Sequence, residues 1–277
     1  MKITNNLNLP EPIVEACKYD DYDAGDADIS VSSLIGPSLI RTLKLKHGEE
    51  STVDVADMIF ALTGKAVHEV LRRSALEGIS EKRLFAEIGG KRLSGQFDHL
   101  SLQSDTLSDY KETSVWSVVY GNDSWEPQLN VYAWLLHKNG YKVPEKLQIV
   151  AFLRDHQKTK AKFDPKYPQF RVHLVPIKRW TIEQTEKFIM ERLDVHFSQP
   201  PTCTDKDRWK TDDKWAVMKN KNVRAVRVLD SEIEAKNYLS SSAGTHIVKR
   251  EGEYRRCSDY CEVNSFCPIY KGENNGS

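Results

Sequence analysis

The chain has 277 residues, of which 39% are hydrophobic, 29% charged and 9% aromatic, an ordinary composition for a globular protein. Its 40 Lys and Arg balance its 40 Asp and Glu. This balance excludes a polybasic tail protein and an acidic solvating chain, but not a nucleic-acid-binding protein, because a basic groove can lie on a neutral molecule. No apolar run is long enough to span a membrane and the N-terminus lacks an apolar signal, so we expect a cytoplasmic protein with no membrane partner.

The N-terminal part of the chain is polar and acidic. Residues 1–60 hold five Lys or Arg against eleven Asp or Glu. Residues 1–30 form a polar N-terminal segment, of which we expect about the first twenty residues to wrap the surface or fray. From Asp54 onward, apolar residues recur three and four apart, which predicts a helix with one mainly apolar face. His68 lies on that face, where it is either a packed core residue or a ligand.

The apolar period then changes to that of strands and shorter helices. A polar connection at 103–106 predicts a hairpin between its two flanking strands. The predicted elements are strands over 83–88, 95–102 and 107–113, a helix over 124–139, strands over 147–153 and 171–177, and a helix over 181–196 that begins with a capping box. Their order predicts an α/β protein with a mixed central sheet flanked by helices, over residues 31–199.

A smaller unit is predicted over residues 200–270. Residues 200–256 hold thirteen Lys or Arg against nine Asp or Glu, so the unit is basic. A hairpin over 215–229, a helix capped by Ser231 and a strand over 245–249 predict an α+β appendage. The polar residues 271–277 are expected to form a disordered tail.

The hairpin carries the residues of greatest chemical interest. Asp98 lies on its first strand, and Asp109 and Lys111 lie two residues apart on the second, so that they share a face. Two carboxylates beside an ammonium suit a divalent cation and a lysine that orients an attacking water. A salt bridge on a solvated hairpin is the alternative, and the Asp-x-Lys pattern by itself favours it.

Cysteines form a second candidate site. The five are Cys17, Cys203, Cys257, Cys261 and Cys267. An odd count in a reducing compartment argues against a disulfide framework. Three of them fall within eleven residues near the C-terminus, which suggests metal ligation.

Four spaced motifs occur in order along the chain: Gly64-x₃-His68, Gly95-x₂-Asp98, Asp109-x-Lys111 and Gln128-x₃-Tyr132. In this combination the chain resembles the PD-(D/E)XK nuclease superfamily in its RecB-type branch, which includes CRISPR adaptation nucleases and phage-type exonucleases. The resemblance implies a restriction-endonuclease-like core with a small C-terminal cysteine-stapled appendage. Stretches such as residues 29–38 also resemble phage members, which implies a phage or prophage source and a bacterial or phage-infected host cell.

The resemblance also implies roles for individual residues. His68, Asp98, Asp109 and the backbone carbonyl of Tyr110 would ligate Mg²⁺ or Mn²⁺. Glu87, on the strand before the hairpin, would be a weaker acidic addition to this ligand set. The remaining residues of the implied site are the catalytic Lys111, and Gln128 and Tyr132, which would contact DNA or brace the site.

For the cysteines, the resemblance implies an iron–sulfur staple. The spacing Cys257-x₃-Cys261-x₅-Cys267 is one residue longer than the commoner family pattern. Cys203 is the favoured fourth ligand, with Cys17 as the alternative, and four thiolates would also suit a structural Zn²⁺.

The function implied is a metal-dependent deoxyribonuclease that acts on DNA as an exonuclease in recombination, repair or degradation, with a recombinase or a single-strand-binding protein as a conceivable partner. The alternatives are a structure-specific or restriction-type endonuclease and a non-catalytic DNA-end-binding module. The intact Asp109-x-Lys111 pair favours an enzyme, because decayed members of the superfamily lose it.

Overall fold

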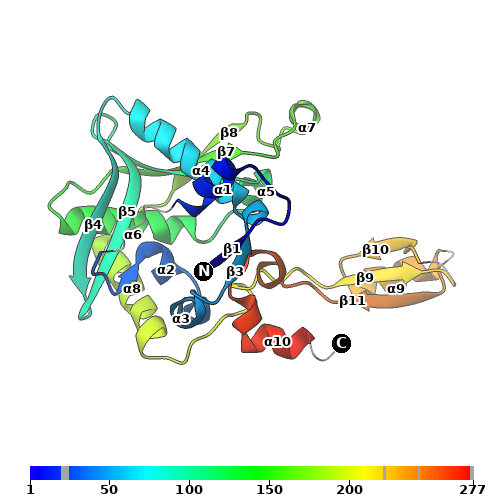
Figure 1. Ribbon diagram of the computed structural model, residues 1–277. Coiled ribbons are helices and arrows are strands. Elements are labelled where there is room, and N and C mark those ends of the chain that lie inside the picture. The colour runs from blue at the N-terminus through cyan, green and yellow to red at the C-terminus, as the bar shows by residue number, and fades with distance from the viewer. Residues whose placement is uncertain (20–24, 221–222, 243, 275–277) are drawn as a thin grey trace. The chain divides into compact units, whose positions relative to one another are not determined.

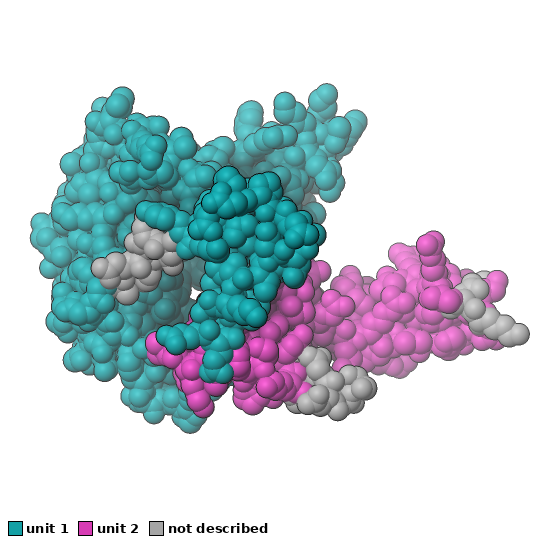
Figure 2. Space-filling view, viewed as in Figure 1, with its two compact units in different colours: residues 1–41, 49–201 teal, residues 42–48, 202–277 magenta. Residues whose placement is uncertain are grey.

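The computed structural model describes residues 1–19, 25–220, 223–242 and 244–274. Two compact units are found in it: residues 1–41 with 49–201, and residues 42–48 with 202–277 (Figure 2). The predicted boundary near residue 200 therefore lies close to the boundary between the units. Residues 42–48, which the sequence analysis assigned to the core, belong to the second unit.

The first unit is built on a mixed six-stranded sheet (Figure 1). Strands β5, β6 and β7 form its centre, where β5 and β6 are antiparallel and β6 and β7 are parallel. The strands follow the order β2-β5-β6-β7-β8, and β4 pairs with β5. Their bounds are β2 (Ile29–Ser30), β4 (Ile79–Ile88), β5 (Lys91–Ser101), β6 (Thr106–Thr113), β7 (Lys146–Leu153) and β8 (Val172–Ile177). The predicted α/β class and the mixed central sheet are confirmed.

Helices cover this sheet (Figure 1). They form where the sequence has apolar residues at helical spacing, as in α6, which has ten buried residues, among them Trp134 and Leu136. The capping box predicted at Thr181 and Gln184 is present at the start of α8. The helices of the first unit are α1 (Glu11–Lys18), α2 (Val31–Ile35), α3 (Ser38–His47, which ends in the second unit), α4 (Val55–Ser74), α5 (Val115–Val119), α6 (Trp125–Lys138), α7 (Lys158–Phe163) and α8 (Ile182–Phe197).

Strand β5 connects the apolar core with the charged side of the sheet. Gly95 and Asp98 are three residues apart on β5 and therefore point to opposite faces. A Cβ at Gly95 would lie 2.8 Å from Tyr132 and 2.7 Å from Leu135 of α6, so the absence of a side chain lets the helix approach the strand. On the other face, Asp98 points toward His68 of α4. The Gly95-x₂-Asp98 motif therefore combines a close helix contact with a charged site.

The second unit contains a three-stranded antiparallel sheet of order β10-β9-β11. Helix α9 packs on it, as shown by the Arg227 guanidinium, which lies 5.1 Å from the Tyr238 ring centroid. The hairpin, helix and strand predicted here are all present. Their bounds are β9 (Lys214–Met218), β10 (Arg227–Leu229), α9 (Glu232–Ser240) and β11 (His246–Arg250), followed by the turns Arg256–Tyr260 and Asn264–Phe266 and by α10 (Pro268–Asn274).

Both termini have more regular structure than predicted. Within residues 1–30, β1 (Lys2–Thr4) pairs with β3 (Thr52–Asp54) in parallel, and α1 and β2 follow. In the predicted tail, residues 271–274 are helical, and 275–277 lie outside the described residues. Pairing with β3 explains the N-terminal difference, because a partner strand distant in the sequence leaves no local signal. In the described part of the chain, none of the helices has the length and apolar composition of a membrane span.

Candidate active site

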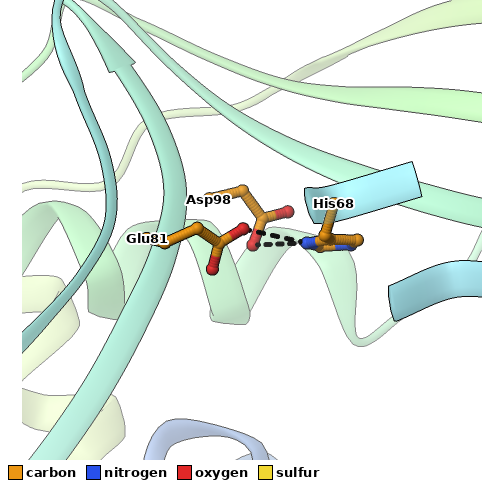
Figure 3. A group of neighbouring side chains, drawn as sticks. All are labelled: His68, Glu81 and Asp98. Carbon is orange, nitrogen blue, oxygen red and sulfur yellow. Dashed lines mark hydrogen bonds and ion pairs between the residues drawn. The ribbon is translucent and has the colours of Figure 1, made fainter. Parts of the chain in front are cut away.

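Three side chains from three elements meet at the charged face of the sheet. His68 comes from α4, Glu81 from β4 and Asp98 from β5, and one ligand atom of each lies within 4.8 Å of the others (Figure 3). His68 Nδ1 lies 3.2 Å from Glu81 Oε1 and 3.6 Å from Asp98 Oδ1. One imidazole and two carboxylates therefore converge on one point.

The other atoms of His68 and Asp98 are held by Tyr110 of β6. His68 Nε2 donates to the Tyr110 carbonyl at 3.1 Å, and the Tyr110 backbone N–H donates to Asp98 Oδ2 at 2.6 Å. This leaves His68 Nδ1 and Asp98 Oδ1 facing the point of convergence. The resemblance implies that the Tyr110 carbonyl is a metal ligand. In this structure it accepts the hydrogen bond that orients the His68 imidazole, as groups that contact the metal ligands commonly do.

Glu81 is a site residue that the sequence analysis did not identify. It is opposite Asp98, between the paired residues Ser80 with His99 and Lys82 with Phe97. Its φ of +50° is in the left-handed region, which is unusual for a residue other than glycine. Its other oxygen accepts a hydrogen bond from Gln96 Nε2 at 2.8 Å. Such a backbone conformation at a cluster of charged groups is characteristic of functional sites.

Glu87 is not part of this group. It is exposed and paired opposite Arg92, six residues after Glu81 on the same strand. At about 3.3 Å per residue, this separates the two carboxylates by about 20 Å along β4. The acid of β4 at the site is therefore Glu81, and the assignment of Glu87 is wrong. The strand predicted from the sequence begins at residue 83 and therefore does not include Glu81, whereas β4 begins at Ile79.

Asp109 and Lys111 lie next to the group of three. The Asp109 side chain is 1% exposed, and its Oδ2 is 2.6 Å from Lys111 Nζ. Despite this short ion pair, neither Asp109 oxygen accepts a well-directed hydrogen bond from the described residues. A buried carboxylate without directed donors is costly unless another charge compensates it. Asp109 thus has oxygen lone pairs available to a cation.

The titration of the group reflects its crowding. Burial, followed by the charge of Asp109, raises the Asp98 pKa to about 7. The hydrogen bond to Glu81 raises the His68 pKa, and the charge of Asp98 adds to this effect. Burial lowers the Lys111 pKa, but the charges of Asp109 and Asp98 outweigh burial and raise it. Without a cation, the group therefore retains protons near neutral pH.

These residues fit a divalent cation. Carboxylate oxygens are the usual ligands for Mg²⁺ and Mn²⁺, and an imidazole nitrogen is a donor that suits transition-metal ions. The repulsion between Asp98 and Asp109 that raises the Asp98 pKa would be relieved by a cation between them. Asp98, Glu81 and His68 form the tightest set, and the open oxygens of Asp109 are an additional donor.

Gln128 and Tyr132 lie in the core behind the site. Both are buried, and Gln128 Nε2 donates to the Tyr132 hydroxyl at 3.2 Å. Burial, followed by the charge of Asp109, raises the Tyr132 pKa. Of the two roles implied for this pair, bracing of the strands therefore fits the structure better than contact with DNA.

The four candidate cysteine ligands all belong to the second unit, whereas Cys17 is buried in α1 of the first. Cys257 is buried and accepts a hydrogen bond from Arg208 Nε at 3.4 Å. Asn264 Nδ2 donates to the Cys257 carbonyl at 2.8 Å and fixes the turn that leads to Cys267. Cys203 and Cys261 are half-buried.

The four thiols influence one another electrostatically. Burial raises the Cys203 pKa to about 12, and the charges of Cys257 and Cys267 contribute. Burial also raises the Cys261 pKa, again with contributions from Cys257 and Cys267. In the part of the chain that the structure describes, no three of these sulfur atoms lie within 4.8 Å of one another.

Comparison with known proteins gives a family and two structural likenesses. The family model described as the PD-(D/E)XK nuclease superfamily matches residues 64–268. No curated protein matches the chain.

Among solved structures, the protein SSO0001 is 13% identical, with 71% of this chain and 89% of that chain covered and a TM-score of 0.48. A phage-related exonuclease from Haemophilus somnus 129PT is 18% identical, with 66% and 76% covered and a TM-score of 0.29. Both TM-scores are below 0.5, so the assignment rests on the family model. Its match includes the four motifs and the three C-terminal cysteines, and the chain belongs to the PD-(D/E)XK nuclease superfamily.

Proposed function

We propose that the protein is a deoxyribonuclease that depends on Mg²⁺ or Mn²⁺ and hydrolyses DNA phosphodiester bonds. The observation that carries this proposal is the convergence of His68, Glu81 and Asp98 within 4.8 Å, next to the open carboxylate of Asp109 and its lysine. An isolated Asp109–Lys111 ion pair would not account for the imidazole and two further carboxylates gathered beside it.

The chain's own groups have distinct tasks. His68, Glu81, Asp98 and Asp109 would hold the cation, which when bound supplies positive charge to the scissile phosphate and acidifies water. Lys111 has a raised pKa and is therefore a cation at neutral pH. Its ammonium stabilises negative charge on the phosphate oxygens and orients the attacking water. Tyr110, Gln128 and Tyr132 hold the strands that carry these groups.

Among nucleases, we place an exonuclease first, because the motif order resembles RecB-type and phage-type members. A role in phage or bacterial recombination, repair or degradation follows from the same resemblance, as does a recombinase or single-strand-binding partner. A structure-specific endonuclease is the second candidate. The intact and geometrically assembled Asp109–Lys111 pair disfavours the non-catalytic module.

We also propose that Cys203, Cys257, Cys261 and Cys267 hold one structural metal centre. Their shared location in the second unit supports this proposal, as does the mutual electrostatic influence of the thiols. By the resemblance, a 4Fe–4S cluster is the first candidate and a structural Zn²⁺ is the alternative. Hydrolysis moves no electrons, so the centre would stabilise the second unit.

The test is digestion of two DNA substrates side by side, an end-labelled linear duplex and a covalently closed circle, each with Mg²⁺ or with EDTA. The proposal expects Mg²⁺-dependent loss of the linear DNA and an intact circle. Cleavage of the circle would favour the endonuclease. If neither DNA is cleaved with Mg²⁺ or with Mn²⁺, the protein would be a non-catalytic DNA-end-binding module.

A further inference from the structure

A hollow in the same unit as the candidate active site has no task in the proposed hydrolysis. It has a volume of about 620 Å³ and is formed by α5 and α7 of the first unit. Aromatic and lysine side chains dominate its walls, with one carboxylate, Asp164. Its lining residues include Trp116, Val119, Lys160, Phe163, Asp164 and Lys166.

The topology of the sheet places this hollow close to the catalytic strand. Strands β6 and β7 are parallel and in register from Thr106 to Thr113, so both end at the same edge of the sheet. Helix α5 directly follows β6, and α7 follows β7 after a short turn. Lys111 is four residues before Val115, which is about 13 Å along an extended chain. Ligands of open α/β sheets commonly bind at such carboxyl ends.

The two helices are firmly held at this edge. Asp155 accepts hydrogen bonds from Ser114 Oγ at 2.6 Å and from the backbone N–H of Val115 at 2.7 Å. The Tyr167 hydroxyl accepts a hydrogen bond from the backbone N–H of Gln157 at 3.0 Å. The walls of the hollow are therefore preformed and need little ordering upon binding, which lowers the entropic cost of a ligand.

Large aromatic side chains remain exposed on these walls. The lining residues Phe163 and Trp116 are 87% and 47% exposed, and Tyr120, at the end of α5 and outside the lining, is 80% exposed. The rings of Trp116 and Tyr120 stack, with centroids 5.5 Å apart and planes 15° from parallel. Exposed apolar side chains that gather in one patch are a feature of interaction sites and ligand-binding grooves.

Positive charge surrounds these rings. Residues 154–171 hold six Lys or Arg against two Asp, and Lys160 Nζ lies 5.7 Å from the Trp116 ring centroid. Four exposed lysines of this segment have no carboxylate within 4.0 Å among the described residues; they are Lys158, Lys160, Lys162 and Lys166. Asp164, the acid of the hollow, accepts the backbone N–H of Lys166 through Oδ1. The surface therefore carries a surplus of unpaired ammonium groups.

We propose that this α5–α7 surface binds single-stranded nucleic acid by stacking unpaired bases on Trp116 and Phe163 while the lysines contact phosphates. Aromatic faces interleaved with unpaired cations are the combination that single strands require, since every base has a face that stacks and every nucleotide carries a negative charge. A purely acidic peptide would use the lysines but leave the rings without a partner. The inference rests on the proposed function and deepens it, because it makes a strand with unpaired bases the substrate that reaches Lys111.

The test compares two fluorescently labelled oligomers of equal length, oligothymidylate and its abasic counterpart, which has the same phosphates without bases. Binding to the full-length protein is measured by anisotropy in EDTA, so that no hydrolysis is needed. The wild type should bind oligothymidylate about tenfold more tightly than the abasic chain, which corresponds to about 1.4 kcal/mol. Trp116→Ala and Phe163→Ala should remove most of this difference and leave the affinity for the abasic chain unchanged.

Two further variants serve as controls. Lys160→Ala should weaken binding of both oligomers equally, because it removes a phosphate contact. Tyr260→Ala removes another exposed aromatic ring, 61% exposed in the second unit, and should leave the preference for oligothymidylate intact. Phe163 is so exposed that its replacement leaves the fold unperturbed, which an unchanged melting temperature would verify.

Equal binding of both oligomers by the wild type would overturn the inference, as would a base preference that survives both aromatic replacements. The latter result would place base recognition elsewhere on the protein. The outcome is separate from that of the proposed function. A protein that cleaves DNA without a base preference is a nuclease without this surface, and one that prefers bases through Trp116 but never cleaves has the surface without the activity.

Discussion

The carboxylate group of the first unit and the thiol group of the second are assembled by different means. His68, Glu81 and Asp98 lie on a long helix and two long paired strands, and their remaining atoms are fixed by hydrogen bonds with Tyr110 and Gln96. The thiols lie on loops and short turns, and Cys257 is held by contacts with Arg208 and Asn264.

The carboxylate group and the thiol group also differ in their protonation. The carboxylate site holds like charges together through its fold, and one of its acids, Asp98, keeps a proton up to a pKa of about 7. Cys203 and Cys261 have raised pKa values and therefore stay neutral without a metal. The carboxylate site is therefore preformed by the sheet, whereas the proposed thiol site would depend on its metal for both charge and order.

The largest expected effect is on the thiol site. Cys261→Ser should abolish the iron or zinc bound by the anaerobically purified protein and unfold the second unit, because binding and folding share one free energy. Metal analysis, visible absorption and hydrogen exchange over residues 202–274 measure this. Cys17→Ser is the matched control and should retain both metal and colour. Retention of full metal content by the Cys261 variant would contradict the proposed centre.

Next in size is the loss of turnover at the carboxylate site. Lys111→Ala should lower the rate of cleavage at least 100-fold, a typical effect of removing a group that stabilises transition-state charge. Binding of DNA should remain, since Lys111 acts on the reacting atoms. Lys146→Ala, an exposed lysine at the start of β7, should cleave at the wild-type rate. A rate within about threefold of the wild type for the Lys111 variant would remove the lysine from the mechanism.

The two acids of β4 allow a sharper comparison. Glu81→Gln should weaken Mn²⁺ binding about tenfold, because it removes one charge from the group of three. Glu87→Gln changes an exposed acid of the same strand and should leave Mn²⁺ affinity unchanged. Calorimetric titration of both variants with Mn²⁺ shows which of the two acids contributes to Mn²⁺ binding. The reverse result would restore the assignment made from the sequence.

The smallest expected effect is a dependence of stability on pH. The folded pKa of Asp98, about 7, is above its ordinary value of 3.8. In this window the folded protein holds a proton that the unfolded chain has released, so the free energy of unfolding falls as the pH rises toward 7. His68, whose pKa is raised above 6.5, acts in the same direction. His196 acts oppositely, because burial lowers its pKa.

The Asp98 contribution is isolated by comparing the wild type with Asp98→Asn. In EDTA, the melting temperature of the wild type relative to this variant should fall by a few degrees between pH 5 and pH 8. Mn²⁺ at pH 8 should reverse the fall in the wild type alone, because the cation replaces the proton. A difference that is flat or rises with pH would show that Asp98 is ionised throughout.

Local patterns were sufficient to predict much of the fold and part of the site. The capping box at Thr181, the polar hairpin connection and the apolar run of β7 are signals within a few residues, and each element formed where it was predicted. Asp98, Asp109 and Lys111 were identifiable because strand spacing places them on one hairpin. Their proximity follows from the antiparallel ladder, which pairs His99 with Ser108.

The remaining features arise from tertiary structure. Glu81 has a left-handed backbone conformation at the start of a strand, and no propensity indicates such a site. Strand β1 forms only because β3, fifty residues later, pairs with it. The α5–α7 hollow depends on two segments brought together by the parallel pairing of β6 and β7. Each of these features needs a partner distant in the sequence.

The central claim is tested most directly by the cleavage rate of a labelled DNA strand as a function of Mn²⁺ concentration, for the wild type and Asp109→Asn in parallel. The wild-type rate should be at background in EDTA and should rise to saturation with Mn²⁺. The Asp109→Asn protein, with native circular dichroism, should stay at background at every concentration. Cleavage by the wild type in EDTA, or a saturating rate for Asp109→Asn near that of the wild type, would contradict the account.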